Sequence, residues 1–380
     1  MIDVIIVRSN SLIYGGARVR KISTTLAKMH SVLVLGWNRE KSQTETIGSN
    51  NVRMEFFNLK APKGKASIVA YLPLFWIWIF VKLCWHKPNA VHACDLDTVL
   101  PCLLYKTIFG KKLVFDVCDK YAMAYISPRL RTIYSIVNLL EEKCVTKADV
   151  LITVSEKLLK SFRARPVNVA VVMNCSDDKE ISIKLPDQKN NRQEIFRLVY
   201  LGNIVKKRVL EEIAMAIKDL DDVKLVMAGH ILDKELFDSL VKMPRVQYKG
   251  VLKYQDSINL ICMSDVMMVL YDPKIPNNLF SCSNKIFEAM MCGLPIITNV
   301  SSDIIKDEVN CGVLVDYNDV NQIKSAIIKL RNNRELQKKF ADNGRQAYLQ
   351  KYNWKSMESK LSQIYEGLLS DQLKAESSVR

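Results

Sequence analysis

The chain has 380 residues, of which 49% are hydrophobic and 25% charged, a globular composition that excludes collagen-like, disordered and repeat-array proteins. At about 150 residues per domain, this length suggests two domains. The formal net charge of +15 lies almost wholly in residues 1–176, which hold 25 Lys and Arg against 12 Asp and Glu, whereas residues 177–380 hold 30 against 28. A basic half and a nearly neutral half indicate domains with different partners.

The first residues, MIDVIIVRSN, lack the basic region and the small-residue cleavage site of a secretory signal. They predict a first strand in a protein that stays in the cytoplasm. The ten cysteines form no Cys-x-x-Cys pair and the four histidines are scattered, so we expect no zinc site. In a reducing compartment the cysteines are expected to be thiols that pack as small hydrophobes.

Short apolar runs alternate with helical patterns along the first half of the chain. Apolar strands separated by helices predict a parallel sheet covered on both faces. The expected strands are 3–7, 31–37, 52–57, 89–93, 112–117 and 149–155, and expected helices include 18–29, 96–109 and 130–147.

A glycine pair and three cations follow the first expected strand. Gly15 and Gly16 would let backbone N–H groups approach a phosphate, and Arg18, Arg20 and Lys21 add positive charge at a helix start. The alternative is a simple turn. Since the segment is not Gly-x-Gly-x-x-Gly, dinucleotide binding has little support.

Residues 66–81 carry no charge. The run has 16 residues and contains Pro73, whereas a bilayer span takes about 20 apolar residues. Three of the five tryptophans, Trp76, Trp78 and Trp85, lie in it or just after it. Two interpretations stay open: a helix buried against a sheet, or a helix that dips into one leaflet. In the second, the flanking cations are Lys60, Lys63, Lys65, Lys82 and Lys87.

Acidic residues follow two expected strands of the first half. Asp95 and Asp97 follow the strand at 89–93, and Asp116 and Asp119 lie on either side of Cys118 at the end of the strand at 112–117. Ligands of parallel sheets bind beyond the carboxyl ends of the strands. These acids are therefore either ligands for sugar hydroxyls or, as for Asp97, helix N-caps.

The second half repeats the same alternation after a polar stretch at 176–195 that is typical of a linker. We therefore predict two doubly wound parallel-sheet α/β domains that face a central cleft, over 1–176 and 177–352, with an amphipathic helix at 353–370. The expected strands of the second domain are 196–202, 223–229, 246–250, 265–270 and 294–299.

Two segments of the second half suit an anionic, hydroxylated ligand. Gly202 and Asn203 lead into the triplet Lys206-Lys207-Arg208, which is either a diphosphate cradle or a solvated basic turn. In the segment 281–295, Ser283 or Asn284 can cap a short helix. Lys285 then lies in its first turn, against the helix dipole. Glu288 falls on its apolar side, where a buried carboxylate needs donors such as those of a ribose diol.

These segments together resemble glycosyltransferase family 4, which contains retaining sugar-nucleotide transferases of GT-B fold. Residues 284–295, NKIFEAMMCGLP, are similar to the family's P-x-K-x-x-E-x-M-A-x-G-x-P segment. Residues 95–98 with Pro101, and residues 18–21, resemble blocks of one branch of the family. Residues 202–208 resemble the turn that grips the diphosphate. Tyr352 to Trp354 and Ile364-Tyr365 resemble the closing helix, which in this fold packs back on the first domain.

The chain departs from the family pattern at four positions. Phe280 stands where the family often has a first glutamate, and Asn203 replaces an arginine of the diphosphate turn. Cys94 and Cys118 stand where histidines are common, so Asp119 becomes the leading polar group of the first-domain half of the site.

The resemblance implies transfer of a sugar from a nucleotide-sugar donor to an acceptor hydroxyl, with no metal and no cofactor. The implied donor-binding residues are Gly16, Gly202, Asn203, Arg208, Ser283, Asn284, Lys285 and Glu288. The implied acceptor-side residues are Arg18, Asp95, Asp97, Cys118 and Asp119, and the catalytic ones are Asp119, Arg208 and Lys285.

Three functional interpretations follow, and one class of partner is not expected. With the basic first half, residues 60–87 favour a glycan or lipid-linked acceptor and an anionic membrane surface, and so a peripheral protein on the inner face of the cell membrane. The alternative is a non-catalytic nucleotide-sugar-binding protein or a partner subunit of a membrane glycosylation complex. A sugar-nucleotide epimerase shares the architecture, but the segment from Lys285 to Glu288 argues against it. We expect no nucleic-acid binding, since the basic excess forms no known module.

Overall fold

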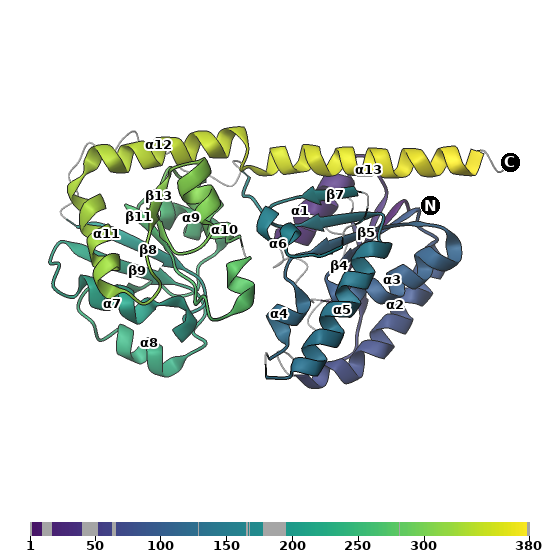
Figure 1. Cartoon of the computed structure of the whole chain (residues 1–380), viewed down its shortest axis with the longest axis horizontal. Helices are drawn as coiled ribbons and strands as arrows, with labels where there is room; N and C mark the ends of the chain where they lie inside the picture. The colour runs from purple at the N-terminus through teal and green to yellow at the C-terminus, as the bar shows by residue number, and fades with distance from the viewer. Residues whose placement is uncertain are drawn as a thin grey trace. The chain divides into compact units, whose positions relative to one another are not determined.

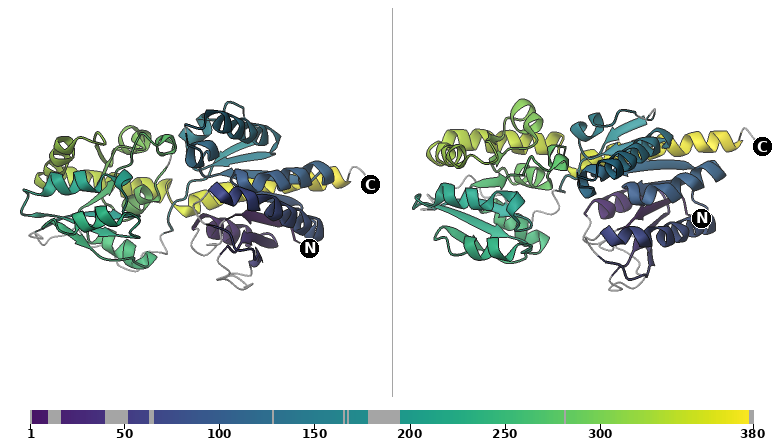
Figure 2. Two further views of the ribbon diagram at one scale, coloured as in Figure 1. Left: turned by 90° about the horizontal axis from the view of Figure 1, so that it is seen from below. Right: turned by 60° about the horizontal axis from the view of Figure 1, so that its bottom comes forward.

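The computed structural model describes residues 2–9, 17–39, 52–62, 66–127, 129–164, 166, 168–177, 195–280 and 282–377 (Figure 1). The chain divides into two compact units. Unit 1 is Met1–Asn174 with Met357–Arg380, and unit 2 is Cys175–Ser356. Most of the expected linker lies outside the described residues. In each unit, helices cover a parallel sheet (Figure 2).

Unit 1 is built on a seven-stranded, all-parallel sheet in the order β3-β2-β1-β4-β5-β6-β7. Its strands are β1 (Val4–Arg8), β2 (Val32–Trp37), β3 (Arg53–Phe57), β4 (Ala90–Cys94), β5 (Lys112–Val117), β6 (Val150–Thr153) and β7 (Asn168–Val171). The sequence patterns missed β7 because this edge strand exposes Asn168 and Val169, so it lacks the fully apolar signature of the others.

The helices of unit 1 form two layers. α2 packs along α3, and α3 contacts α5, so these three lie together on one side of the sheet. From β4, the ring of His92 reaches the hydroxyl of Tyr365 in α13 at 2.8 Å. The helical elements are α1 (Ala17–Leu26), η2 (Ala66–Tyr71), α2 (Leu72–His86), α3 (Leu96–Phe109), α4 (Tyr121–Tyr125), α5 (Arg131–Lys147), α6 (Glu156–Lys160) and α13 (Trp354–Ser377).

The apolar run at 66–81 forms the turn η2 and most of α2. Pro73 does not interrupt this helix, because it occupies the first turn, where a missing N–H costs nothing. One side of α2 is buried in unit 1: Phe75 is fully buried and stacks on Trp37 of β2, with ring centroids 4.9 Å apart.

Unit 2 is built on a six-stranded parallel sheet in the order β10-β9-β8-β11-β12-β13. Its strands are β8 (Phe196–Leu201), β9 (Val223–Ala228), β10 (Val246–Tyr248), β11 (Val266–Val269), β12 (Ile296–Thr298) and β13 (Gly312–Leu314). The sequence analysis missed the short edge strand β13. The fold class of two doubly wound parallel-sheet domains is confirmed.

The helical elements of unit 2 connect these strands and lead on to α13. They are η4 (Lys206–Arg208), α7 (Leu210–Ile217), α8 (Lys234–Leu240), α9 (Tyr254–Cys262), η5 (Pro276–Leu279), α10 (Asn284–Met291), the π-helical turn η6 (Asp303–Glu308), α11 (Val320–Asn332) and α12 (Arg334–Gln350).

In both sheets the strand order reverses at one point. In unit 1 the chain builds outward in one direction from β1 and in the other from β4, and in unit 2 the corresponding pair is β8 and β11. Right-handed crossovers then place the connecting helices on opposite faces, so the loops at the carboxyl ends of the two central strands separate and leave a crevice.

Two glycines allow the loops after β8 and β9 to touch. A Cβ atom added to Gly229 would lie 1.9 Å from the carbonyl oxygen of Gly202, and Gly229 has a φ of 143°. The N–H of Gly202 donates to the carbonyl of Ala228 at 2.9 Å, so the same contact continues the sheet into the loop.

We expect Gly229→Ala to lower the free energy of unfolding by about 2 kcal/mol or more, because the backbone must move to relieve both the contact and the torsion. Gly110→Ala is the matched control: its φ is 64° but no atom of the described residues lies within 4 Å of the added Cβ, so about 1 kcal/mol is expected. Urea unfolding measures both, and equal losses would contradict the close-contact explanation.

Candidate functional site

An ion pair occupies the point of reversal in unit 1. Arg8 ends β1 and Asp95 follows β4, and Nη2 of Arg8 lies 3.3 Å from Oδ2 of Asp95. The other carboxylate oxygen of Asp95 accepts the backbone N–H of Cys118 at 3.0 Å, which ties the β5 loop to the pair. Asp95 has a φ of 63°, a strained backbone for a non-glycine residue and a feature of functional sites.

Burial changes the pKa of two carboxyl groups at this point, those of Asp95 and of the neighbouring Asp97. Burial raises the pKa of Asp95 to about 6, although Arg8 acts in the opposite direction. Burial also raises the pKa of Asp97, partly offset by a hydrogen bond from Ser9. Asp97 is not the N-cap of the helix: α3 starts at Leu96, which puts Asp97 in its first turn.

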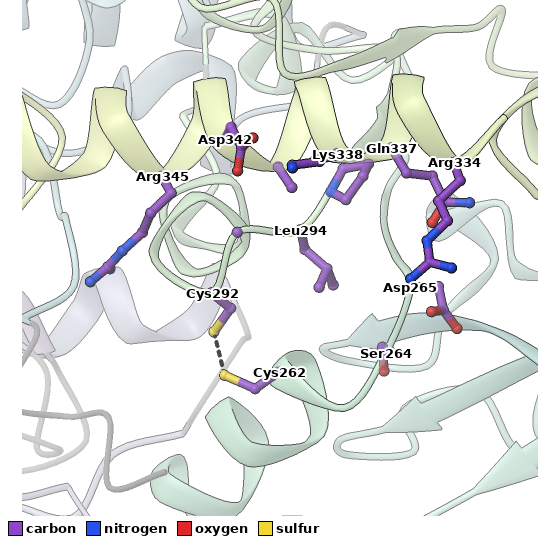
Figure 3. Close-up of a pocket in the computed structure, with 13 residues that line it drawn as sticks. Cys262, Ser264, Asp265, Cys292, Leu294, Arg334, Gln337, Lys338, Asp342 and Arg345 are labelled. Atoms are coloured by element: carbon purple, nitrogen blue, oxygen red, sulfur yellow. Dashed lines mark hydrogen bonds between the residues drawn. The ribbon is translucent and has the colours of Figure 1, made fainter. Parts of the chain in front are cut away.

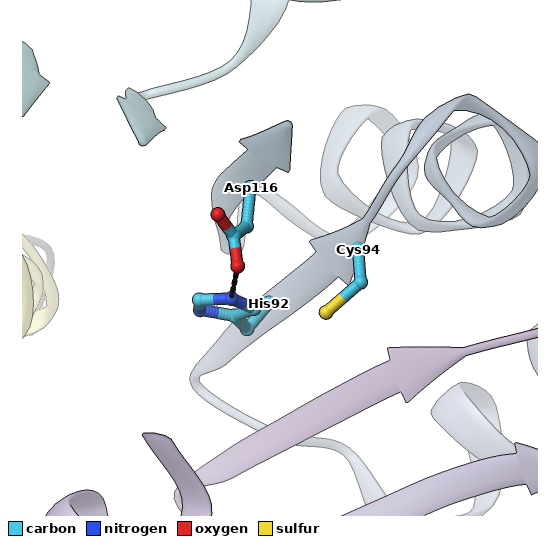
Figure 4. Close-up of side chains that lie close together, drawn as sticks. All are labelled: His92, Cys94 and Asp116. Carbon is cyan, nitrogen blue, oxygen red and sulfur yellow. Dashed lines mark hydrogen bonds and ion pairs between the residues drawn. The ribbon is translucent and has the colours of Figure 1, made fainter. Parts of the chain in front are cut away.

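A buried network lies beneath the same edge of the sheet. Arg18 donates to both carboxylate oxygens of Asp116, at 2.7 and 2.5 Å, and to the carbonyl of Val172 at 2.7 Å. His92 reaches Asp116 at 3.2 Å (Figure 4). Burial alone would raise the pKa of Asp116, but Arg18 and His92 hold that pKa well below its usual range. The sequence predicts Arg18 on the acceptor side. Its side chain is only 6% exposed, and it holds Asp116 of β5 from inside the unit.

His92, Cys94 and Asp116 have the atom types of a metal site. In the described part of the chain they form a group whose possible ligand atoms lie within 4.8 Å of one another. A cation would compete with Arg18 for the carboxylate of Asp116, and burial raises the pKa of the Cys94 thiol well above its usual value. These residues therefore fit a metal ion poorly, and metal independence stays a prediction.

The loop after β5 is held in place from α5. Cys118 and Asp119 begin this loop, and Nη1 of Arg8 lies 3.5 Å from the thiol of Cys118. Lys120 donates to Glu142 at 2.9 Å, and Glu141 accepts the N–H of Tyr121 at 3.0 Å. Burial raises the pKa of Glu141 to about 8, and its second oxygen has no hydrogen-bond partner among the described residues.

An arginine also stands at the point of reversal in unit 2. Arg208 ends the turn η4 after β8, and its guanidinium lies 3.8 Å over the ring of Tyr271, two residues beyond β11. Tyr271 donates from its hydroxyl to Ser283 at 2.8 Å. Ser283 is the N-cap of α10, so Tyr271 connects the cationic turn to the start of this helix.

The segment 283–293 has the local structure that its sequence predicts. Ser283 accepts the N–H of Lys285, and Gly293, with a φ of 64°, follows the end of the helix. Glu288 is buried at 4% exposure, and the ammonium of Lys285 donates to it at 2.8 Å. The sequence predicts ribose hydroxyls as the hydrogen-bond donors to Glu288. In the free protein, the ammonium of Lys285 is the donor.

The remaining predicted donor residues lie around these elements. Gly202 and Asn203 follow β8; the side chain of Asn203 is exposed and its carbonyl accepts the hydroxyl of Tyr200 at 2.7 Å. Asn284 is the first residue of α10. The basic triplet forms its own turn, and α7 starts only at Leu210. Gly16 lies outside the described residues.

A cavity of about 310 Å³ lies in unit 2 away from these loops (Figure 3). Its lining includes Asp265 and Pro295, which precede β11 and β12, so it opens at the amino ends of the strands. The thiols of Cys262 and Cys292 are 2.9 Å apart beside it. Ligands of parallel sheets bind at the opposite ends, so we do not place the donor in this cavity.

Three residues of the candidate site were not predicted from the sequence: Arg8, Tyr271 and Glu141. Arg8 and Tyr271 lie at carboxyl ends of strands, so the rule that singled out the acidic residues would have found both. Glu141 carried no signal, because its burial depends on how α5 packs under the β5 loop.

Known proteins resemble the chain in sequence and in fold. Residues 195–333 match the model of a family described as glycosyl transferases group 1. An uncharacterized glycosyltransferase of Methanocaldococcus jannaschii is 23% identical over 314 residues, which cover 77% of this chain and 72% of that protein. A second one from the same organism is 25% identical over 228 residues, which cover 59% and 61%.

Solved structures share the fold over nearly the whole chain. A sucrose-phosphate synthase from Thermosynechococcus elongatus has a TM-score of 0.79 at 15% identity and covers 98% of this chain and 100% of its own. Anabaena HepE, in complex with UDP and glucose, has a TM-score of 0.73 at 15% identity, with 96% and 100% covered. The resemblance to group 1 glycosyltransferases of GT-B fold is confirmed, whereas family 4 and the retaining stereochemistry stay predictions.

Glu141 yields a pH-dependent prediction. An exposed glutamate has a pKa of about 4.3, so between about pH 4 and pH 8 the folded chain keeps a proton that the unfolded chain has released, and stability falls as pH rises. Glu141→Gln removes this titration. We expect the free energy of unfolding of the variant, measured in urea, to decline less between about pH 5 and pH 8 than that of the wild type.

The exposed Glu366→Gln gives the effect of removing a surface carboxylate from the same unit. A decline in Glu141→Gln as steep as in the wild type would show that Glu141 ionises normally in the folded protein.

Proposed function

We propose, from the match of residues 195–333 to the family of group 1 glycosyltransferases, that the chain transfers a sugar from a nucleotide-sugar donor to an acceptor hydroxyl with retention of configuration. The complex of HepE with UDP and glucose supports this donor class. Unit 2 holds the donor and unit 1 supplies the polar groups for the acceptor.

One observation carries the donor assignment. Nη1 of Arg208 is buried and has no hydrogen-bond partner in the described part of the chain, and Tyr271 holds the guanidinium in place. A buried donor left unsatisfied costs about 1–3 kcal/mol. A diphosphate oxygen at the crevice would accept this N–H and form a charge-assisted hydrogen bond.

The start of α10 supplies the rest of the donor site. The side chain of Lys285 is 28% exposed and its ammonium donates to Glu288, so it can turn from the carboxylate to a phosphate. The ribose diol then replaces the ammonium as the hydrogen-bond donor to Glu288. This exchange keeps the buried carboxylate satisfied in both the free and the bound protein.

The reaction breaks the bond between the anomeric carbon and the diphosphate oxygen and forms one to the acceptor oxygen. Negative charge develops on the leaving diphosphate, where Arg208 and Lys285 stabilise it. The acceptor proton passes to a donor phosphate oxygen. In unit 1, Asp119 and Asp95 orient the acceptor hydroxyl, and Arg8 and Cys118 hold Asp95 in position.

Substitutions in unit 2 separate these roles. We expect Arg208→Gln to lower kcat by roughly 10²–10³-fold, since the cation acts on charge that develops in the transition state. Glu288→Ala should chiefly raise the KM for the donor, because ribose is bound alike in the ground and transition states. Transfer by the purified protein, over a panel of sugar nucleotides, measures both.

Lys324→Gln removes a surface cation of the same unit, paired only loosely with Asp219 at 3.6 Å, and should leave both constants unchanged. An unaltered donor KM in Glu288→Ala would contradict the ribose assignment. Absence of both transfer and donor hydrolysis in the wild type, with binding intact, would favour the non-catalytic alternative, which is motivated by Cys94, Cys118, Asn203 and Phe280.

The acceptor is proposed to be a glycan or a lipid-linked glycan at a membrane, because α2 is apolar on two opposite sides. Leu72, Phe75, Ile79 and Leu83 are buried in the unit. Leu74, Ile77, Val81 and Trp85 form a second stripe that is 54–79% exposed. A helix of a soluble core needs only the first stripe. The core interpretation thus describes the inner side of α2, and we assign the outer side to one leaflet of a membrane.

The inner stripe argues against a spanning helix. Residues 68–86 are long and apolar enough to cross a membrane, and 22% of them are buried. Withdrawing Phe75 and Ile79 into a bilayer would, however, open the core of unit 1. We therefore propose a peripheral attachment on the cytoplasmic side, with the exposed Lys60 and Lys87 near anionic headgroups, each worth about 1 kcal/mol, whereas Lys82 is paired with Glu55.

Flotation tests this attachment. We expect the wild type to float with vesicles of phosphatidylcholine and phosphatidylglycerol, and less with phosphatidylcholine alone. The double variant Ile77→Glu/Val81→Glu should lose most of the bound fraction, because two carboxylates in the outer stripe resist transfer to the bilayer. Met263→Glu, on an exposed apolar residue of unit 2, is the control. No flotation of the wild type would leave a soluble acceptor.

A further inference from the structure

We propose that the membrane-docking surface is not confined to residues 60–87 but extends over the outer sides of α2, α3 and α5, called here the three-helix face, with an anionic bilayer as its occupant. This inference rests on the proposed membrane attachment and extends it to two helices whose sequences gave no such indication. The observations that carry it are exposure, adjacency and charge.

The amino-terminal half of α5 exposes a second apolar stripe. Ile133, Ile136, Leu139 and Leu140 are 36–60% exposed, at the three- and four-residue spacing of one helix side. The carboxyl-terminal half of the helix packs normally, with Cys144 and Val145 buried. An ordinary surface helix places its apolar residues toward the core, whereas no described segment of the chain covers the apolar side of this half-helix.

α3 connects the two stripes. It packs along α2 on one side and contacts α5 on the other. Its own exposed apolar residues are Leu104, Ile108 and Phe109, at 49–57%. Eleven of the 26 large apolar side chains exposed in the described chain lie on these three helices, which have 15, 14 and 17 residues. Such a concentration on one layer is typical of an interaction surface.

The exposed charged side chains of this layer are all positive. The carboxylates of the three helices are Asp97, half-buried at the edge, and Glu141 and Glu142, both buried. Exposed cations lie at both ends of α5, namely Arg129, Arg131, Lys143 and Lys147, with Lys87 at the end of α2. Aliphatic and tryptophan side chains among cations, with no exposed carboxylate, suit a leaflet with anionic headgroups.

The proposed surface also has an orientation. α5 starts at the carboxyl end of the sheet, because it follows the β5 loop and leads into β6. On α2, the indole N–H of Trp76 donates to the carbonyl of Asp97 at 2.7 Å. A bilayer against the three-helix face would therefore lie beside the loops that carry Asp95 and Asp119, where the head group of a lipid-linked acceptor must enter.

Variants in α5 test this inference separately from the attachment through α2. We expect Ile133→Glu/Ile136→Glu to lower the fraction of protein that floats with phosphatidylglycerol-containing vesicles at least threefold. Met263→Glu again serves as the control. Because both isoleucines are exposed, the variant should fold, and an unchanged melting temperature checks this.

Charge variants give a second, independent readout. Lys143→Glu/Lys147→Glu leaves the apolar stripe intact but should reduce the difference between vesicles with and without phosphatidylglycerol at least twofold, because Arg129, Arg131 and Lys87 remain. If the variants in α2 lose flotation while both α5 variants float like the wild type, the three-helix face is refuted and the attachment through residues 60–87 stands. If no wild-type protein floats, the membrane attachment itself is refuted.

A second copy of the chain is the competing occupant. Size-exclusion chromatography of the same variants distinguishes it. A wild-type dimer that does not float, and that Ile133→Glu/Ile136→Glu converts to a monomer, would overturn the bilayer assignment. A monomeric wild type that floats, and whose flotation changes in both α5 variants as expected above, supports the bilayer assignment.

Discussion

The reversal of strand order in each sheet is the constraint on which the candidate site depends. It separates the loops after the two central strands. The backbone and side chains at this point are therefore packed against protein on some sides and open to a ligand on the others. An arginine stands at both reversals, Arg8 against Asp95 and Arg208 over Tyr271. In unit 1 the cation is neutralised by a carboxylate, whereas in unit 2 it rests on an aromatic ring and keeps a donor for an anion.

The polar groups at these reversals need rigid support. In unit 1 this support is the buried network of Arg18, Asp116 and His92, which Tyr365 closes from α13. Removing one partner from such a network leaves a buried charge unpaired, which typically costs about 3–5 kcal/mol. The network thus fixes the carboxyl end of β5 and joins the first strands of the chain to its last helix.

The apolar segment at 66–86 lies in two environments, because one side of α2 is buried in unit 1 and the other side is exposed. Its hydrophobicity exceeds what the core of unit 1 can bury, and the excess emerges as one stripe of α2. The exposed stripes of α3 and α5 follow from the same packing: one sheet face accommodates a single layer of helices, and within the part of the chain that the structure describes no further layer covers its outer side.

The sequence by itself determined what depends on short range. The periodic apolar runs predicted both sheets, and Ser283, Gly293 and the apolar positions between them predicted α10, because caps and helix periodicity act within a few residues. Only the tertiary structure decided which polar side chains contact each other and which are buried. Arg18 pairs with Asp116, Arg208 with Tyr271, and Glu141 is buried, since each contact joins residues brought together by crossovers between strands. For the same reason, the outer side of α5 became visible as an apolar surface only once the layer of helices was assembled.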